Sequence, residues 1–200
     1  MIDNLEIVKK LLNFSEDGDF YMLYIFKRKK DQPEGERENH QSVRTIKTYC
    51  IESIDHLERR YDEVKKLCEV FSARAYIHIQ KQNHRDVSLE MMISLAERLR
   101  NGQHNQKGLF DSVVGQIKTM EKRWIVDVDT KDCKEIFRIK LGIDECRPYA
   151  MDKVIAEVPT KNGYHLITER FDTQEFCKNF PGVDVQKKNP TLLYLPESLH

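Results

Sequence analysis

The stretch KRWIVDVDT, residues 122–130, has the alternating pattern of a half-buried β-strand but carries two acids near its end. Side chains of a strand point alternately to its two faces, so Trp124 shares one face with the valines two and four positions later. Asp127 and Asp129 share the opposite face. The apolar face can pack beneath helices. The sequence therefore predicts two carboxylates side by side on an uncovered face of a sheet.

The residues that follow predict a compact α+β unit. We expect a helix capped by Thr130 or Asp132 and running to about Leu141, strands over 153–160 and 163–170 around a turn at Lys161-Asn162, a helix after Asp172, and a last core strand over 182–186. With the strand at 122–129, this order is β-α-β-β-α-β, which places helices on one face of an antiparallel sheet. The terminal segment that follows contains an apolar TLLYL.

The first half of the chain also alternates between strands and helices. The patterns predict helices over 2–13, after the N-cap Ser53 and over 87–100, strands over 20–28, 42–51 and 74–82, and a solvated loop over 29–41. The strand at 74–82 alternates apolar and polar residues, so we expect it to be half-exposed. A polar break at 101–108 divides the chain into an N-terminal α/β lobe, 1–105, and a second lobe, 106–200, of one two-lobed unit.

Composition narrows the classes of function that the chain can have. Lys+Arg and Asp+Glu both number 33 among 200 residues, so a nucleic-acid partner has to be argued from particular residues and not from net charge. The five cysteines are scattered without a zinc-binding spacing, which favours reduced thiols. There is no secretory signal pattern and no apolar run long enough to span a membrane. We therefore expect a cytoplasmic protein without membrane contact.

Acids and a histidine lie on three of the predicted strands. If the strands are neighbours, Asp127, Asp129 and Asp184 converge with His165 on one face. Three carboxylates crowd together only with a cation, and oxygen ligands of this kind suit a pair of Mg²⁺ or Mn²⁺ ions. His165 and Lys161 could then bind the phosphates of a substrate.

Each of these features also has a simpler structural explanation. Asp184 follows Gly182 and fits turn chemistry, and Lys187-Lys188 fits a solvated charge pair. A D-x-D sequence at a strand end and a single histidine on a strand are also common. The hypothesis of a metal site depends on the order in which the motifs occur.

Three motifs in this order resemble the archaeo-eukaryotic primases and primase-polymerases. IVDVD (125–129) is similar to their first motif, TKNGYHLIT (160–168) to their second, and GVDVQKKNPTLLY (182–194) to their third. Gly163 stands where that family typically has Ser, and no zinc-binding element is present, which favours nucleotidyl transfer over de novo priming. The resemblance implies that 106–200 is an RRM-like catalytic lobe completed by the N-terminal lobe.

The resemblance also implies roles for single residues. Asp127, Asp129 and Asp184 would hold the metal pair, His165 would contact a phosphate of the incoming (d)NTP, and Lys161 and Lys188 would assist. The implied reaction adds a (d)NTP to a 3′-hydroxyl or an initiating nucleotide on a single-stranded DNA or RNA template. A replicative helicase is an expected partner, since the chain has no motor of its own.

Two other classes of function stay open at this level. One is a non-catalytic RRM-like module that binds single-stranded nucleic acid, and the other is a metal-dependent nuclease. The strands of the first half add five candidates for a groove lining: Arg44, Lys47, Tyr76, His78 and Lys81. A solvated strand face is the favoured explanation for each of these five residues, and Tyr76 and His78 are the two of most interest.

Overall fold

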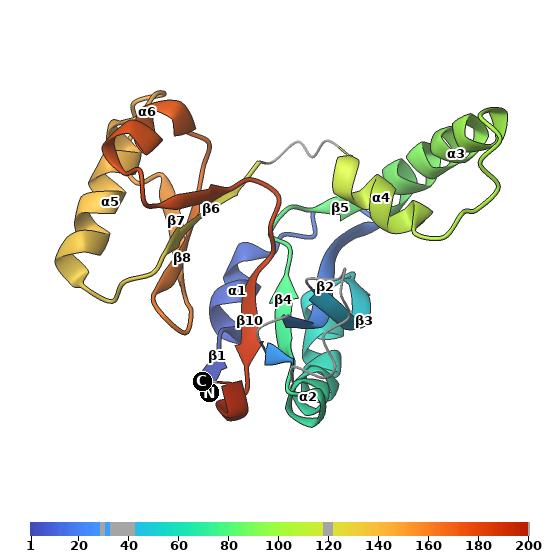
Figure 1. Cartoon of the computed structure of the whole chain (residues 1–200), viewed down its shortest axis with the longest axis horizontal. Helices are drawn as coiled ribbons and strands as arrows, with labels where there is room; N and C mark the ends of the chain where they lie inside the picture. The colour runs from blue at the N-terminus through green and yellow to red at the C-terminus, as the bar shows by residue number, and fades with distance from the viewer. Residues whose placement is uncertain (29–30, 33–42, 118–121, 200) are drawn as a thin grey trace.

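The computed structural model describes residues 1–28, 31–32, 43–117 and 122–199, and it shows an α+β fold with two antiparallel sheets (Figure 1). The first sheet contains β1 (Ile2–Asp3), β2 (Asp19–Arg28), β3 (Val43–Ile51), β4 (Arg74–Ile77), β5 (Gln82–Asn83) and β10 (Thr191–Leu195). The second contains β6 (Trp124–Val128), β7 (Val154–Pro159), β8 (Tyr164–Thr168) and β9 (Asp184–Gln186). The described helices are α1 (Leu5–Leu11), α2 (Ile54–Phe71), α3 (His84–Arg100), α4 (Leu109–Gln116), α5 (Cys133–Glu145) and α6 (Thr173–Asn179).

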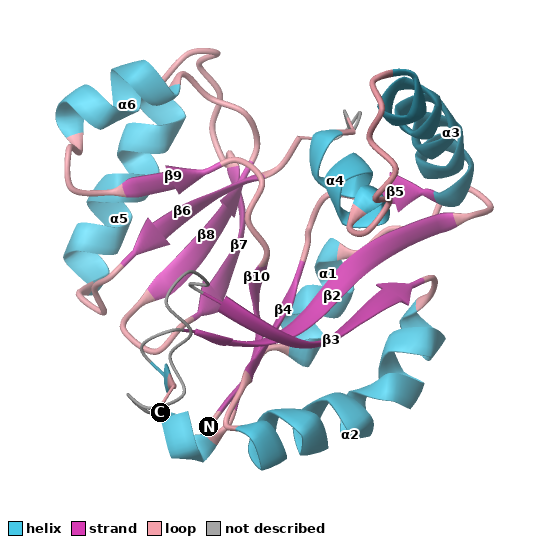
Figure 2. Ribbon diagram, turned by 45° about the vertical axis from the view of Figure 1, so that its right-hand side comes forward, coloured by secondary structure: helices cyan, strands magenta, loops and turns pink. Residues whose placement is uncertain are grey.

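The second sheet has the strand order β7-β8-β6-β9, with every neighbouring pair antiparallel (Figure 2). Helices α5 and α6 cover one face, where Val126 and Val128 of β6 pack against Ile139 and Phe176. Both helices begin as the sequence predicts, because Asp132 and Asp172 accept hydrogen bonds from backbone N–H groups of the first turn. Trp124, Val126 and Val128 therefore face the helices.

The first sheet has the order β1-β10-β4-β2-β3, with β5 paired to β2. Helix α2, capped by Ser53 as predicted, covers one face. Helices α3 and α4 pack on Phe20 and Met22 and project from the body of the molecule (Figure 1). Strand β10 comes from the end of the chain, yet it lies between β1 and β4, so residues 191–195 complete the sheet of the first half (Figures 1 and 2).

The predicted helix at 2–13 and the predicted strand at 182–186 both differ from the observed elements. Ile2 and Asp3 pair with Leu195 and Tyr194, so they form a strand and the helix begins only at Leu5. The strand predicted over 182–186 is reduced to Asp184–Gln186 at the sheet edge, and the fully buried last strand is β10. The predicted loop 29–41 lies outside the described residues except at 31–32.

The expectation of a half-exposed strand at 74–82 was wrong. Strand β4 ends at Ile77 and is buried on both faces, because Ala75 and Ile77 pack in the core beneath α2 while Tyr76 packs with Leu192 on the other side. Alternation correctly separates the two faces of the strand but does not show that the polar face is covered. No helix in the described part of the chain combines the length and apolar character needed to cross a membrane.

Candidate functional site

Strand β6 places Asp127 between a histidine and a second carboxylate. In the β-ladders, Asp127 is opposite His165 of β8 on one side and opposite Asp184 of β9 on the other. Directly opposed residues of antiparallel strands project to the same face and have close Cβ atoms. The three side chains therefore lie in a row across three neighbouring strands, as the alternation of the sequence predicts.

The face that carries this row is not uncovered, contrary to the sequence expectation. Ile125 and Ile167 lie on it and pack against Leu11 of α1 and Ile79 of the first half. His165 is also buried, with 6% of its surface exposed. The first half of the chain thus covers the apolar end of the face and leaves the acidic end at the edge of the contact.

His165 is held in place by a residue from the other sheet. Its Nδ1 lies 3.0 Å from Oγ1 of Thr191 in β10, and its Nε2 lies 3.6 Å from Oδ1 of Asp127. Burial, assisted by the charge of Arg28, lowers the pKa of His165 to about 4. The imidazole is therefore neutral at pH 7, and its contact with Asp127 is not an ion pair.

The surroundings of Asp127 disfavour the negative charge of its carboxylate. Burial raises its pKa, as do the charges of Asp129 and Asp184, whereas Arg28 lowers it. Its side chain is still 28% exposed, so a ligand can reach it. Within the described residues, no three His, Cys, Asp or Glu side chains form a ready-made metal site. The donor set nevertheless has the chemistry that a hard divalent cation requires, since all three groups are carboxylates that repel one another.

A cavity between the two halves brings basic and aromatic side chains to these acids. Asp127 and His165 line it together with Arg28, Tyr76 and Lys161. The Arg28 Nη2 donates a hydrogen bond of 2.6 Å to the Tyr76 hydroxyl. The cavity thus combines carboxylates with a guanidinium and an ammonium group, an arrangement that suits a metal-bound polyphosphate.

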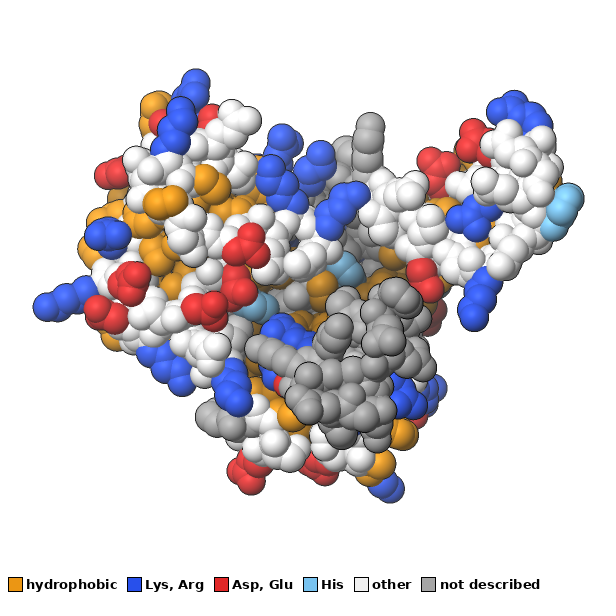
Figure 3. Space-filling view, in the orientation of Figure 1, with side chains coloured by type: hydrophobic (Ala, Val, Ile, Leu, Met, Phe, Trp, Pro, Cys, Tyr) orange, Lys and Arg blue, Asp and Glu red, His pale blue; other side chains and the backbone are white. Residues whose placement is uncertain are grey.

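A second cavity lies on the other side of the same acids. Asp127 and Asp129 line this cavity as well, together with Asp184, Arg138 of α5 and Phe180. Asp127 of β6 and Asp129, which follows the end of that strand, therefore border both cavities. Figure 3 shows acidic side chains gathered beside a histidine on this part of the surface.

The two lysines of the sequence prediction lie in different places. Lys161 lines the cavity with Asp127, and its ammonium group donates to the carbonyl of Leu199 at 2.9 Å. Lys188 donates to the carbonyl of Gly115 and lines a separate cavity with Tyr24 and His78. The structure therefore does not bring Lys188 together with the acids.

Arg28, Thr191 and Tyr76 also belong to the site, although the sequence prediction left them out of its site residues. Arg28 ends the aromatic strand β2, and its only sequence signal is its position at the end of an apolar run. Thr191 is the first residue of the apolar TLLYL, and nothing in that segment connects it with His165. Tyr76 belongs to β4, whose contact with the second half cannot be read from local alternation. Their placement depends on how the two sheets meet.

The site is thus a row of Asp184, Asp127 and His165 on the second sheet, bordered by Arg28 and Lys161. It lies where the first half of the chain contacts the second. No family model, curated protein or solved structure that we compared with this chain matches it.

Proposed function

We propose that the chain is a metal-dependent nucleotidyltransferase of the primase-polymerase type. It would join a (d)NTP to the 3′-hydroxyl of a nucleic acid, or to an initiating nucleotide, on a single-stranded template. The observation that carries the proposal is the position of Asp127 between His165 and Asp184, at a cavity that also contains Arg28 and Lys161.

The topology of the second half supports an RRM-like catalytic lobe. The elements β6, α5, β7, β8, α6 and β9 follow one another in the order β-α-β-β-α-β. The first and third strands of this unit, β6 and β8, are central in the sheet, and the helices cover one face. The acids and the histidine lie on the face opposite the helices, where RRM-like sheets bind their ligands.

The carboxylates of Asp127, Asp129 and Asp184 are the groups that would hold Mg²⁺ or Mn²⁺. Burial and then the charges of Asp129 and Asp184 raise the pKa of Asp127, and a divalent cation would relieve the repulsion among the three carboxylates. When bound, a pair of such ions supplies activation of the attacking hydroxyl and charge stabilisation at the phosphates.

The other residues of the site are suited to holding a triphosphate. If the buried Thr191 hydroxyl donates to Nδ1 of His165, the imidazole proton is on Nε2, the nitrogen near Asp127, where it can donate to a phosphate oxygen. Arg28 and Lys161 offer permanent positive charge at the same cavity. Together they would orient the α-phosphate toward the acids.

The test is incorporation of labelled nucleotides on a primed single-stranded DNA template with Mg²⁺ and with Mn²⁺. We expect extension by the wild-type chain and a loss of at least about a hundredfold in Asp127→Asn, the order found when one group that stabilises transition-state charge is removed. Asp62→Asn is the matched control, because the Asp62 side chain is 94% exposed on α2, away from the site.

Two results would count against the proposal. Equal extension by the wild-type chain and Asp127→Asn would remove the acids from the reaction. Shortening of the input strand without incorporation would instead indicate a metal-dependent nuclease.

A further inference from the structure

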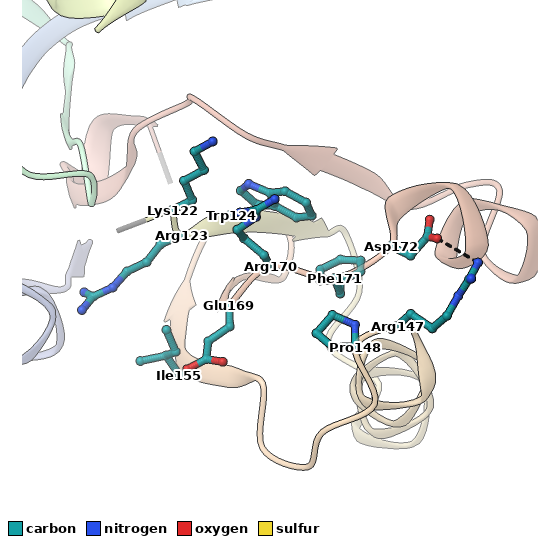
Figure 4. A pocket seen from close by; sticks show the side chains of 10 residues that line it. All are labelled: Lys122, Arg123, Trp124, Arg147, Pro148, Ile155, Glu169, Arg170, Phe171 and Asp172. Atoms are coloured by element: carbon teal, nitrogen blue, oxygen red, sulfur yellow. Dashed lines mark hydrogen bonds and ion pairs between the residues drawn. The ribbon is translucent and has the colours of Figure 1, made fainter. Parts of the chain in front are cut away.

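A large cavity lies at the other end of β6 from the acids (Figure 4). It has a volume of about 890 Å³ and is lined by residues of four segments that meet at this end of the second sheet. Trp124, the first residue of β6, contributes an aromatic ring, and Phe171 lies below it. Trp124 is three residues before Asp127, about 10 Å along the strand, and it points to the opposite face of the sheet.

The cavity is rich in cations. Lys122, Arg123, Arg147 and Arg170 line it, against the acids Glu169 and Asp172. Arg147 is paired with Asp172, and Arg123 donates to the carbonyl of Leu11. Lys122 and Arg170 are exposed and form no ion pair with any residue that the structure describes. Two cations next to the tryptophan are therefore available to an anionic ligand.

Trp124 offers a stacking surface between these cations. Its ring is half-buried, with Phe171 against it at a centroid distance of 5.4 Å and the Lys187 ammonium group 4.7 Å from its centroid. Figure 4 shows Lys122 and Arg170 near the indole, while Glu169 points toward Ile155. Aromatic rings flanked by Lys and Arg are the common platform for single-stranded nucleic acids, because every base can stack and every linkage carries a negative charge.

We propose that this cavity binds single-stranded nucleic acid, with a base stacked on Trp124 and phosphates at Lys122 and Arg170. The contact is separate from the carboxylate site, where the acids repel phosphate in the absence of a metal. It does not require a metal or a reaction at Asp127. The nearby loop supports a binding role, since Tyr149 and Met151 expose 73% and 86% of their surface there.

The test uses the fact that the chain contains one tryptophan, so its intrinsic fluorescence reports on this cavity. The full chain is titrated in EDTA with an oligothymidylate of about 15 nucleotides, near the upper site size of such platforms. Fluorescence anisotropy of a labelled copy of the oligonucleotide is followed in parallel. We expect tryptophan quenching and the anisotropy rise to have the same midpoint, and both to weaken with added salt.

Charge reversals test the cations. The double variant Lys122→Glu/Arg170→Glu should weaken binding at least about tenfold, since each contact to phosphate contributes to the salt-dependent affinity. The matched control is Arg100→Glu/Lys107→Glu, which makes the same charge change at an exposed position at the end of α3 and at another in the loop after it. This control should bind the oligonucleotide as the wild-type chain does. Trp124→Leu, followed by anisotropy, should weaken binding by about five- to hundredfold.

Three results would overturn the inference: an anisotropy rise without quenching, equal binding by the charge-reversed variant, or quenching by dTTP with the same midpoint as by the oligonucleotide. An oligouridylate distinguishes RNA from DNA as the preferred strand. Asp127→Asn should retain full quenching. In the wild-type chain, quenching without extension would count against the proposed function alone, and extension without quenching would count against this binding site alone.

Discussion

Gly163 lies at the point where the turn before β8 touches the end of β6. A Cβ atom at this position would lie 1.9 Å from the carbonyl oxygen of Val128 and 2.7 Å from the backbone of Thr130. The glycine is therefore required by close packing of two backbones beside the candidate site. A serine side chain would not fit here without movement of the chain.

Gly163→Ala should lower the free energy of unfolding by at least about 1–3 kcal/mol, because the clash is with backbone atoms that cannot turn away. Urea unfolding of the wild-type and variant chains measures this. Gly182→Ala is the control, since a Cβ there meets no atom within 4 Å. Equal destabilisation by the two substitutions would contradict the packing explanation.

The buried His165 and the partly buried His78 make the stability of the fold depend on pH. Burial lowers the pKa of both His78 and His165 from 6.5 to about 4, so the unfolded chain binds protons that the folded chain does not between these values. The stabilisation is complete above pH 6.5 and is lost as the pH falls toward 4. A full shift of this size corresponds to about 3 kcal/mol for each residue.

The free energy of unfolding of the wild-type chain should fall between pH 7 and pH 4. In His78→Phe, this fall should be smaller by up to about 3 kcal/mol. Urea unfolding at several pH values gives the slope. His104→Phe, at an exposed position, should keep the wild-type slope. If His78→Phe also keeps the wild-type slope, the neutral state of His78 in the folded chain is refuted.

Side chains form hydrogen bonds with backbone groups at the N-termini of α5 and α6 and at the C-terminus of α5. Asp132 and Asp172 cap the N-termini of α5 and α6. At the other end of α5, the ammonium group of Lys153 is buried and donates to the carbonyls of Ile143, Asp144 and Cys146. The lysine just before β7 thus donates to three carbonyl oxygens at the end of the helix, and it fixes the helix to the sheet.

Lys153→Met should lower the free energy of unfolding by about 1–3 kcal/mol or more, because buried carbonyl groups lose their donor while the side-chain volume is retained. Thermal unfolding monitored by circular dichroism is the measurement. Lys131→Met, at an exposed position before α5, should have little effect. Similar behaviour of the two variants would show that Lys153 does not stabilise the helix end.

The two halves of the molecule are joined by contacts as well as by the chain. The buried Asn4 amide donates to the carbonyls of Pro159 in β7 and Leu192 in β10, and the Gln80 amide donates to those of Arg123 and Lys187. The apolar contact of Leu11 and Ile79 with the second sheet lies between these two links. The candidate site is formed at the same junction, so its geometry depends on how the halves pack.

Asn4→Ala should destabilise the second half although the residue precedes α1. We expect Trp124 fluorescence and far-ultraviolet circular dichroism to report the same unfolding transition. In the variant, the free energy of unfolding from both signals should be lower by about 1–3 kcal/mol, the cost of leaving buried carbonyls unsatisfied. Asn13→Ala, at an exposed position after α1, is the control. A shift in circular dichroism without a shift in Trp124 fluorescence would mean that the halves unfold independently.

The local sequence pattern predicted the two faces of β6 and the starts of several helices. The alternation over 124–129 correctly separated the valines from the acids. Ser53 and Asp172 marked two helix starts, and Asp132 was one of the two caps predicted for a third, because caps and face alternation depend only on neighbouring residues. The same pattern is consistent with the row of Asp127, His165 and Asp184, once the strands are neighbours.

Only the tertiary structure determined which residues pack against the polar faces of the strands. The sequence pattern predicts that the strand of Tyr76 is half-exposed and that the face with the acids is uncovered. Both predictions were wrong, because alternation shows the polarity of a strand face and not the partner packed against it. The entry of β10 into the first sheet is a pairing over more than a hundred residues, which local sequence does not encode. That pairing brings Thr191 to His165, and the contact between the halves brings Arg28 to Asp127, so the basic side of the site exists only in the folded chain.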